Sequence, residues 1–143
     1  MTRIELAKQE LVQGKYSCVL VQDGEVVMTS FEKGVKPLMH FYELRELYKS
    51  PVLADKVIGR AAAFLAVLCG ITEVYAEVIS EEAIKVLDDY QIPVTVGRVV
   101  PYIANRNGDG LCPMEELSKD VKTPLEMYVK IQKWLQKLEI NRD

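Results

Sequence analysis

The chain is predicted to form one mixed α/β domain, a three-layer α/β/α sandwich built on a mixed central sheet. Segments with strand-like patterns alternate with segments of helical spacing, which is typical of a sheet with helices on both faces. The length of 143 residues matches a single compact domain that spans 1–143. A hydrophobic content of 49% is ordinary for a globular protein and supplies enough apolar side chains for one core.

The first part of the chain is predicted to form a helix, a hairpin and a second helix. Thr2 and Glu5 have the spacing of a capping box, so the first helix begins there and ends near Gly14. Two strand-like runs, 16–22 and 25–30, lie on either side of an Asp-Gly step, which is a strong hairpin signal. Apolar residues at helical spacing then predict a helix over 37–49, with proline at its first position.

The middle of the chain is predicted to form a buried helix over 55–69, because this segment is apolar on nearly all sides. Asp55 is suited to cap its first N–H groups. A strand over 73–79, a helix from Ser80 to about 90 and a β-rich run over 93–100 follow. A short helix from Pro113 and a last helix from the capping-box sequence 123–126 complete the order.

Composition and charge narrow the classes of function. A net charge of -3 weighs against general nucleic-acid binding, which usually needs a basic face. The N-terminus lacks the apolar run of a signal peptide, and the longest apolar stretch, 61–70, is too short to cross a membrane. Three cysteines, an odd number without close pairs in the sequence, do not indicate a disulfide framework. We therefore expect a cytoplasmic protein with reduced thiols, no membrane partner and no general nucleic-acid binding.

Residues 105–116 are the most polar stretch and directly precede a predicted helix. Pro113 suits the first turn of that helix, which makes Cys112 its N-cap. A thiol at a helix N-terminus tends to have a lowered pKa and is a candidate nucleophile. The alternative is that Cys112 caps, packs or only contacts a ligand. The one histidine, His40, lies on the predicted 37–49 helix, and nothing in the sequence brings it to Cys112.

The same stretch mimics the spacing of a calcium-binding loop. Its polar residues occupy the first, third, fifth, sixth and twelfth places of such a loop: Asn105, Asn107, Asp109, Gly110 and Glu116. An EF-hand also needs a helix that enters the loop, and the prolines and β-rich run before it argue against one. With one histidine and no Cys-x-x-Cys, a structural zinc site is not expected either, and we predict no metal and no cofactor.

Two segments carry a resemblance to a known family: Ala-Asp-Lys-Val-Ile-Gly-Arg-Ala-Ala-Ala at 54–63 and Gly-Leu-Cys-Pro-Met-Glu at 110–115. The chain resembles a family of uncharacterised prokaryotic proteins with a cytidine-deaminase-like fold. Zinc deaminases hold the metal through His or Cys at the starts of two helices. The corresponding positions, taken as 55–57 and 79–83, carry neither residue. The resemblance therefore implies a deaminase-like scaffold without its zinc site.

The resemblance also implies that the start of the predicted 55–69 helix borders a pocket. Helix N-termini bind anions, and Lys56 and Arg60 would share one side of that helix. If the polar loop folds over this end, the two segments form a site for a phosphate or carboxylate. The predicted ligand-binding residues are Asp55, Lys56, Arg60, Asn105, Arg106 and Asp109.

The sequence thus favours a degenerate, zinc-free deaminase-fold protein that binds a small anionic or nucleotide-like ligand. One alternative is a metal-independent enzyme that uses Cys112 as a nucleophile in acyl or other group transfer. Another is a regulatory module whose partner is a protein. The fold is also compatible with a homo-oligomer, although no interface is visible in the sequence.

Overall fold

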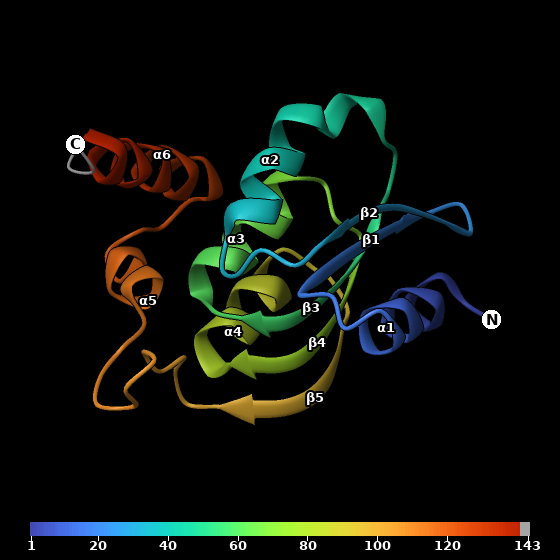
Figure 1. Cartoon of the computed structure of the whole chain (residues 1–143), viewed down its shortest axis with the longest axis horizontal. Helices are drawn as coiled ribbons and strands as arrows, with labels where there is room; N and C mark the ends of the chain where they lie inside the picture. The colour runs from blue at the N-terminus through green and yellow to red at the C-terminus, as the bar shows by residue number, and fades with distance from the viewer. Residues whose placement is uncertain (141–143) are drawn as a thin grey trace.

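The computed structural model describes residues 1–140 and shows a mixed five-stranded sheet flanked by helices (Figure 1). The strand order is β2-β1-β3-β4-β5. β1 pairs antiparallel with both β2 and β3, whereas β3, β4 and β5 run parallel. The strands are β1 (Cys18–Gln22), β2 (Glu25–Ser30), β3 (Val52–Ile58), β4 (Glu73–Ser80) and β5 (Val94–Val100).

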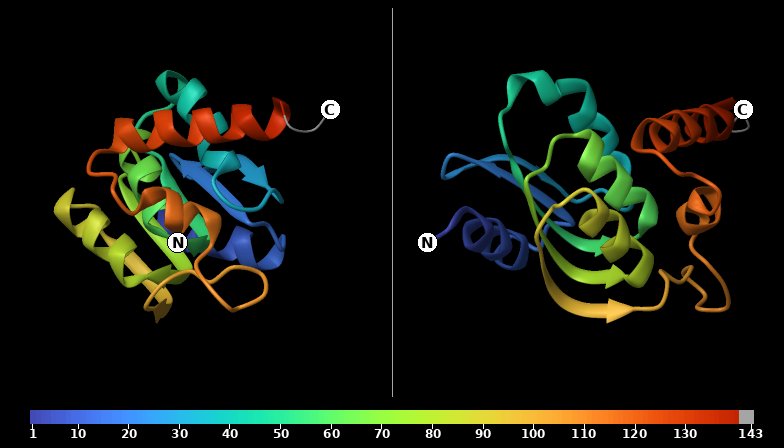
Figure 2. Two further views of the ribbon diagram at one scale, coloured as in Figure 1. Left: turned by 90° about the vertical axis from the view of Figure 1, so that its left-hand side faces the viewer. Right: turned by 180° about the vertical axis from the view of Figure 1, so that it is seen from behind.

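Helices cover both faces of the sheet, as the alternating sequence patterns predicted (Figures 1 and 2). α1 packs alone on one face against β1, β3 and β4. α2, α3 and α4 lie on the other face, and α5 and α6 pack outside them against α3. The helices are α1 (Arg3–Gln13), α2 (Lys36–Leu44), α3 (Arg60–Leu68), α4 (Glu81–Asp89), α5 (Pro113–Ser118) and α6 (Pro124–Ile140), with a 3-10 turn over Arg45–Leu47.

The predicted helix starts are confirmed in their hydrogen bonds. Thr2 and Glu5 form a complete capping box at α1. Ser80 Oγ accepts from Ala83 N at α4. At α6, Thr123 Oγ1 accepts from Glu126 N, whereas the Glu126 carboxylate reaches the Lys122 N–H. The N–H groups of Glu5, Ala83 and Glu126 have no partner within their own helices, and the side chains of Thr2, Ser80 and Thr123 satisfy them.

The hairpin is also confirmed, with Asp23 and Gly24 both at positive φ between β1 and β2. Such a turn matches the right-handed twist of two paired strands. The hairpin places Ser17 next to the segment that leaves β2, because Ser17 Oγ donates to Ser30 O at 2.9 Å and also to Glu32 O.

The predicted helix over 55–69 is wrong in its first part. Residues Val52–Ile58 form the central strand β3, and the helix begins only at Arg60, after Gly59. Both segments are apolar because each is buried on more than one side. A buried strand and a buried helix have the same continuous hydrophobic signature, and periodicity does not separate them. This difference moves Asp55 and Lys56 from a helix start onto a strand.

Candidate functional site

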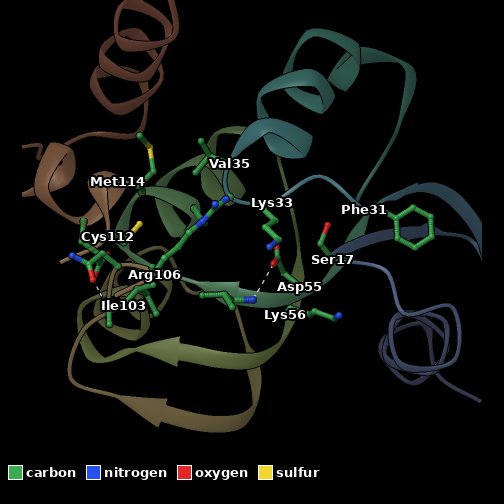
Figure 3. A pocket seen from close by; sticks show the side chains of 18 of the residues that line it. Ser17, Phe31, Lys33, Val35, Asp55, Lys56, Ile103, Arg106, Cys112 and Met114 are labelled. Carbon is green, nitrogen blue, oxygen red and sulfur yellow. Dashed lines mark hydrogen bonds between the residues drawn. The ribbon is translucent and has the colours of Figure 1, made fainter. Parts of the chain in front are cut away.

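A cavity of about 480 Å³ lies where β3 ends and α3 begins (Figure 3). We call it the β3–α3 cavity. Its walls come from the ends of the hairpin, the loop before α2, the β3–α3 junction and the segment between β5 and α5. The polar lining residues are Lys15, Ser17, Lys33, Asp55, Lys56, Asn105, Arg106, Cys112 and Glu115. The apolar ones are Phe31, Val35, Val57, Ala61, Ala62, Ile103, Ala104 and Met114, with Gly34 and Gly59 between them.

Asp55 is one of two buried acids of this cavity, with only 6% of its surface exposed, and Glu115 is the other. Its Oδ1 accepts a hydrogen bond from Val57 N at 3.1 Å. Burial raises the pKa of the Asp55 carboxyl from 3.8 to about 8, against the opposing effect of the Val57 and Lys56 backbone N–H groups. Asp55 is therefore mostly a neutral acid at pH 7.

Lys56 and Arg60 do not share a face, in contrast to the prediction. Neighbouring residues of a strand point to opposite faces, so Lys56 leaves the sheet on the side opposite Asp55. Figure 3 shows its ammonium pointing away from the Asp55 carboxyl. The Arg60 guanidinium donates to Ser118 O and lies 4.8 Å from the Phe64 ring centroid, so it serves the packing of α3 against its neighbours.

Glu115 occupies the helix end that was expected to bind an anion. Its Oε1 accepts from Arg60 N at 2.9 Å, and its Oε2 accepts from Ile103 N at 3.1 Å. The carboxylate of Glu115, a residue of α5, thus caps the N-terminus of α3. It also holds the backbone at Ile103, where the polar loop begins. Gly59 makes room for it, because a Cβ at Gly59 would lie 2.6 Å from Glu115 Oε1.

The Asn105–Asp109 turn is stabilised by its own side chains. Asn105 Nδ2 donates to Asp109 Oδ1 at 2.9 Å, and Asp109 N donates to Asn105 Oδ1 at 3.3 Å. Asn105 N also donates to Gly110 O at 2.9 Å, and a β-bridge joins Ala104 to Leu111. Asn105 lines the β3–α3 cavity, whereas Asp109 does not, so the predicted role of Asp109 in orienting a ligand is not supported by its position. The segment before the turn is β5 and a loop, which is not the entering helix of an EF-hand.

Arg106 and Lys33 approach the cavity from opposite walls. Arg106 comes from the polar loop, and Figure 3 shows its side chain extending toward Val35 and Lys33. Lys33 comes from the loop between β2 and α2. Within residues 1–140 the ion pairs within 4.0 Å are Lys85–Glu82 and Lys119–Glu116. Neither Arg106 nor Lys33 is therefore in an ion pair with a carboxylate in the part of the chain described.

Cys112 is the N-cap of α5 with Pro113 after it, as predicted. It lines the cavity and is half-buried, while the other two free cysteines, Cys18 and Cys69, are buried. Its N–H donates to Ile103 O at 2.9 Å, which fixes the backbone there. His40 is exposed on α2 and is not part of the cavity wall.

Three charged lining residues were not predicted from the sequence: Lys15, Lys33 and Glu115. Lys33 stands one residue before Gly34, whose φ of 74° turns the chain into α2, so the turn signal was the available clue. Glu115 was part of the recognised motif, but nothing in a sequence shows that its carboxylate caps a helix 55 residues away.

Among residues 1–140, no group of three or more His, Cys, Asp or Glu side chains is placed to hold a metal ion. No helix in that range is both long and apolar enough to cross a membrane.

The fold and the cavity define a mixed α/β domain with a ligand-sized hollow at the carboxyl end of its central strand, which is where α/β sheets commonly bind ligands. The chain belongs to the domain-of-unknown-function family DUF1893, whose model, TM1506, matches residues 6–135. It is similar to the crystal structure of the DUF1893 family protein TM1506 from Thermotoga maritima, determined at 2.70 Å. The TM-score is 0.80 at 23% sequence identity, covering 90% of this chain and 87% of that one. No curated protein matches the chain.

Proposed function

We propose that the protein binds a small anionic or nucleotide-like ligand in the β3–α3 cavity. The observation that carries this proposal is the convergence of Arg106 and Lys33, from separate segments, on one cavity without carboxylate partners in residues 1–140. Unpaired cations beside a hollow with apolar walls favour a ligand that brings a negative group and an apolar body. The volume lies within the usual range of about 300–1,000 Å³ for small-molecule sites.

The acids of the cavity do not oppose an anion strongly. Asp55 is mostly neutral at pH 7 because its pKa is about 8. The Glu115 carboxylate is already engaged by two backbone N–H groups. With Lys15 also on the wall, the side chains around the hollow carry more positive than negative charge.

We also propose that the scaffold is of the cytidine-deaminase type. The support is the resemblance in sequence together with a hairpin, an antiparallel β1 and three parallel strands joined by helices. The helices that follow β3 and β4 are α3 and α4, which begin after Gly59, a lining residue of the cavity, and after Ser80. The starts of these helices carry no His or Cys, so the residues present do not fit a deaminase zinc ion.

The test removes both cations at once. We expect Lys33→Ala with Arg106→Ala to weaken binding of the ligand at least about tenfold, because charge-assisted hydrogen bonds are lost. The matched control is Lys133→Ala with Lys137→Ala, which removes two charges from exposed positions of α6. Native mass spectrometry of the purified protein, followed by calorimetry with phosphate, nucleoside monophosphates and carboxylates, supplies the ligand and its affinity. Equal weakening in the two double variants, or no weakening in the cavity variant, would contradict the proposal.

A second candidate is an enzyme in which Cys112 is the nucleophile. The observation that favours it is that Cys112 is half-buried in the wall of the same cavity. Incubation with activated acyl donors and intact mass spectrometry would detect an adduct on Cys112. Adduct formation that is no faster than on free cysteine would exclude this role.

A further inference from the structure

One oxygen of the Asp55 carboxyl accepts a hydrogen bond from the protein, and the other is available to hydrogen-bond with a ligand. Oδ1 accepts from Val57 N at 3.1 Å, and this is the hydrogen bond that the carboxyl makes within residues 1–140. The neighbouring Lys56 N–H instead donates to Ser17 O at 3.0 Å. A carboxyl that is 6% exposed and lines a cavity is therefore open to the cavity through Oδ2 and through the second lone pair of Oδ1.

No cation neutralises this carboxyl from the elements around it. The titratable groups that face it or share its cavity are Cys18 across the β1–β3 pairing, Lys15, Lys33, Lys56, Arg106, Cys112 and Glu115. Lys33 is the cation whose side chain points toward the carboxyl in Figure 3. None of the basic groups among residues 1–140 forms an ion pair with Asp55 within 4.0 Å. A buried carboxyl without a cationic partner keeps its proton, because the charged form loses its hydration.

We infer that Asp55 determines ligand specificity by acting as a neutral acid that pairs with an amide or amidine edge of the ligand. The inference rests on the proposed function. Oδ2–H would donate to a ligand nitrogen or carbonyl oxygen, and Oδ1 would accept from the adjacent N–H of the ligand. Such a pair brings no net charge into the buried end of the cavity, whereas an ammonium group would require Asp55 to ionise first.

The two ends of the cavity then recognise different parts of one molecule. In Figure 3 the Arg106 side chain ends beside Val35 and the Lys33 side chain runs toward Asp55, so the anionic group is expected at these two cations and the edge of the ligand at Asp55. Adenosine 5′-monophosphate combines an amidine edge with a phosphate, so it is a suitable probe. Ribose 5-phosphate carries the same phosphate without the edge and serves as the matched control.

The decisive comparison is Asp55→Asn against Asp55→Ala. Asparagine presents one donor and one acceptor, as a protonated carboxyl does, but it cannot ionise. By calorimetry at pH 7 we expect the wild type to bind adenosine monophosphate at least tenfold more tightly than ribose 5-phosphate. Asp55→Asn should stay within threefold of the wild type, and Asp55→Ala should fall to the affinity of ribose 5-phosphate.

The pH dependence gives a second readout. Between pH 7 and 9 the preference of the wild type for adenosine monophosphate over ribose 5-phosphate should decline at least threefold, while the preference of Asp55→Asn stays constant. The ratio of the two probes cancels the titration of the phosphate itself.

The possible results separate the two proposals. If Asp55→Asn loses as much affinity as Asp55→Ala, an ionised carboxylate is needed and the inference is overturned. If both probes bind equally well in every variant, the edge contact is wrong while anion binding stands. If neither adenosine monophosphate, ribose 5-phosphate nor the other nucleoside monophosphates bind, both the inference and the proposed function fail.

Discussion

Raising the pH is expected to destabilise the protein through Asp55. The pKa of this carboxyl is about 8 in the folded chain and 3.8 without the protein environment. The folded state therefore keeps a proton that the unfolded chain has already released. Stability is highest below the unfolded pKa and is lost as the pH rises through the folded pKa, that is, over the window from about 4 to about 8.

The magnitude follows from the size of the shift. One pKa unit corresponds to about 1.4 kcal/mol, so the free energy of unfolding should fall by about that amount per pH unit between pH 5 and pH 7. The total over the window is roughly 6 kcal/mol. The Asp55 side chain is buried, so solvent does little to screen its electrostatic interactions.

The assay is urea unfolding of the wild type and Asp55→Asn at pH 5, 6 and 7. Asparagine keeps an oxygen for the Val57 N–H and removes the titration, so the difference between the two proteins isolates Asp55. We expect the free energy of unfolding of Asp55→Asn, relative to that of the wild type, to increase by about 1.4 kcal/mol for each pH unit. Parallel stability profiles would show that Asp55 ionises freely and would refute the reasoning.

Three further results are expected. Glu115→Ala leaves two backbone N–H groups without a partner, so urea unfolding should show a loss of about 2–5 kcal/mol, with a smaller loss for Glu115→Gln. Gly59→Ala forces a Cβ against the Glu115 carboxylate and should lower the free energy of unfolding by about 1–3 kcal/mol. Gly110→Ala, whose Cβ would meet its nearest neighbour at 3.5 Å, should change it by less than about 0.5 kcal/mol and is the control. Iodoacetamide should modify Cys112 in the native protein and all three cysteines only after denaturation, as counted by intact mass; modification of the buried thiols at a similar rate would contradict the packing.

The elements with local signals could be predicted from the sequence. Thr2, Ser80 and Thr123 each cap the helix that their spacing indicated, and the Asp-Gly step is the turn of the β1–β2 hairpin. Local signals suffice there because the hydrogen bonds join residues three or four apart. The strand β3 was missed because its burial comes from β1 and β4, which are distant in sequence.

The candidate site was predicted in its segments but not in its geometry. Asp55, Arg106 and Cys112 do line one cavity, as their two segments suggested. Lys56 and Arg60 do not share a face as predicted, because Lys56 lies on strand β3 and only Arg60 lies on helix α3. Side chains of a strand alternate between its two faces, whereas residues four apart on a helix share one. Lys33 reaches the site through the path of the loop before α2, for which Gly34 signals a turn but not its direction.

The self-contained turn at the tip of the polar loop has a practical consequence. Asn105 and Asp109 hold this turn through contacts with each other, so the residues between them need no support from the rest of the molecule. Gly108, at φ 75°, marks its outermost bend and has open space around it. A fluorescent label attached through Asn107→Cys, at an exposed position beside this bend, would sit one residue from Arg106 and report occupancy of the hollow in real time, which would turn the protein into a sensor for screening metabolite libraries.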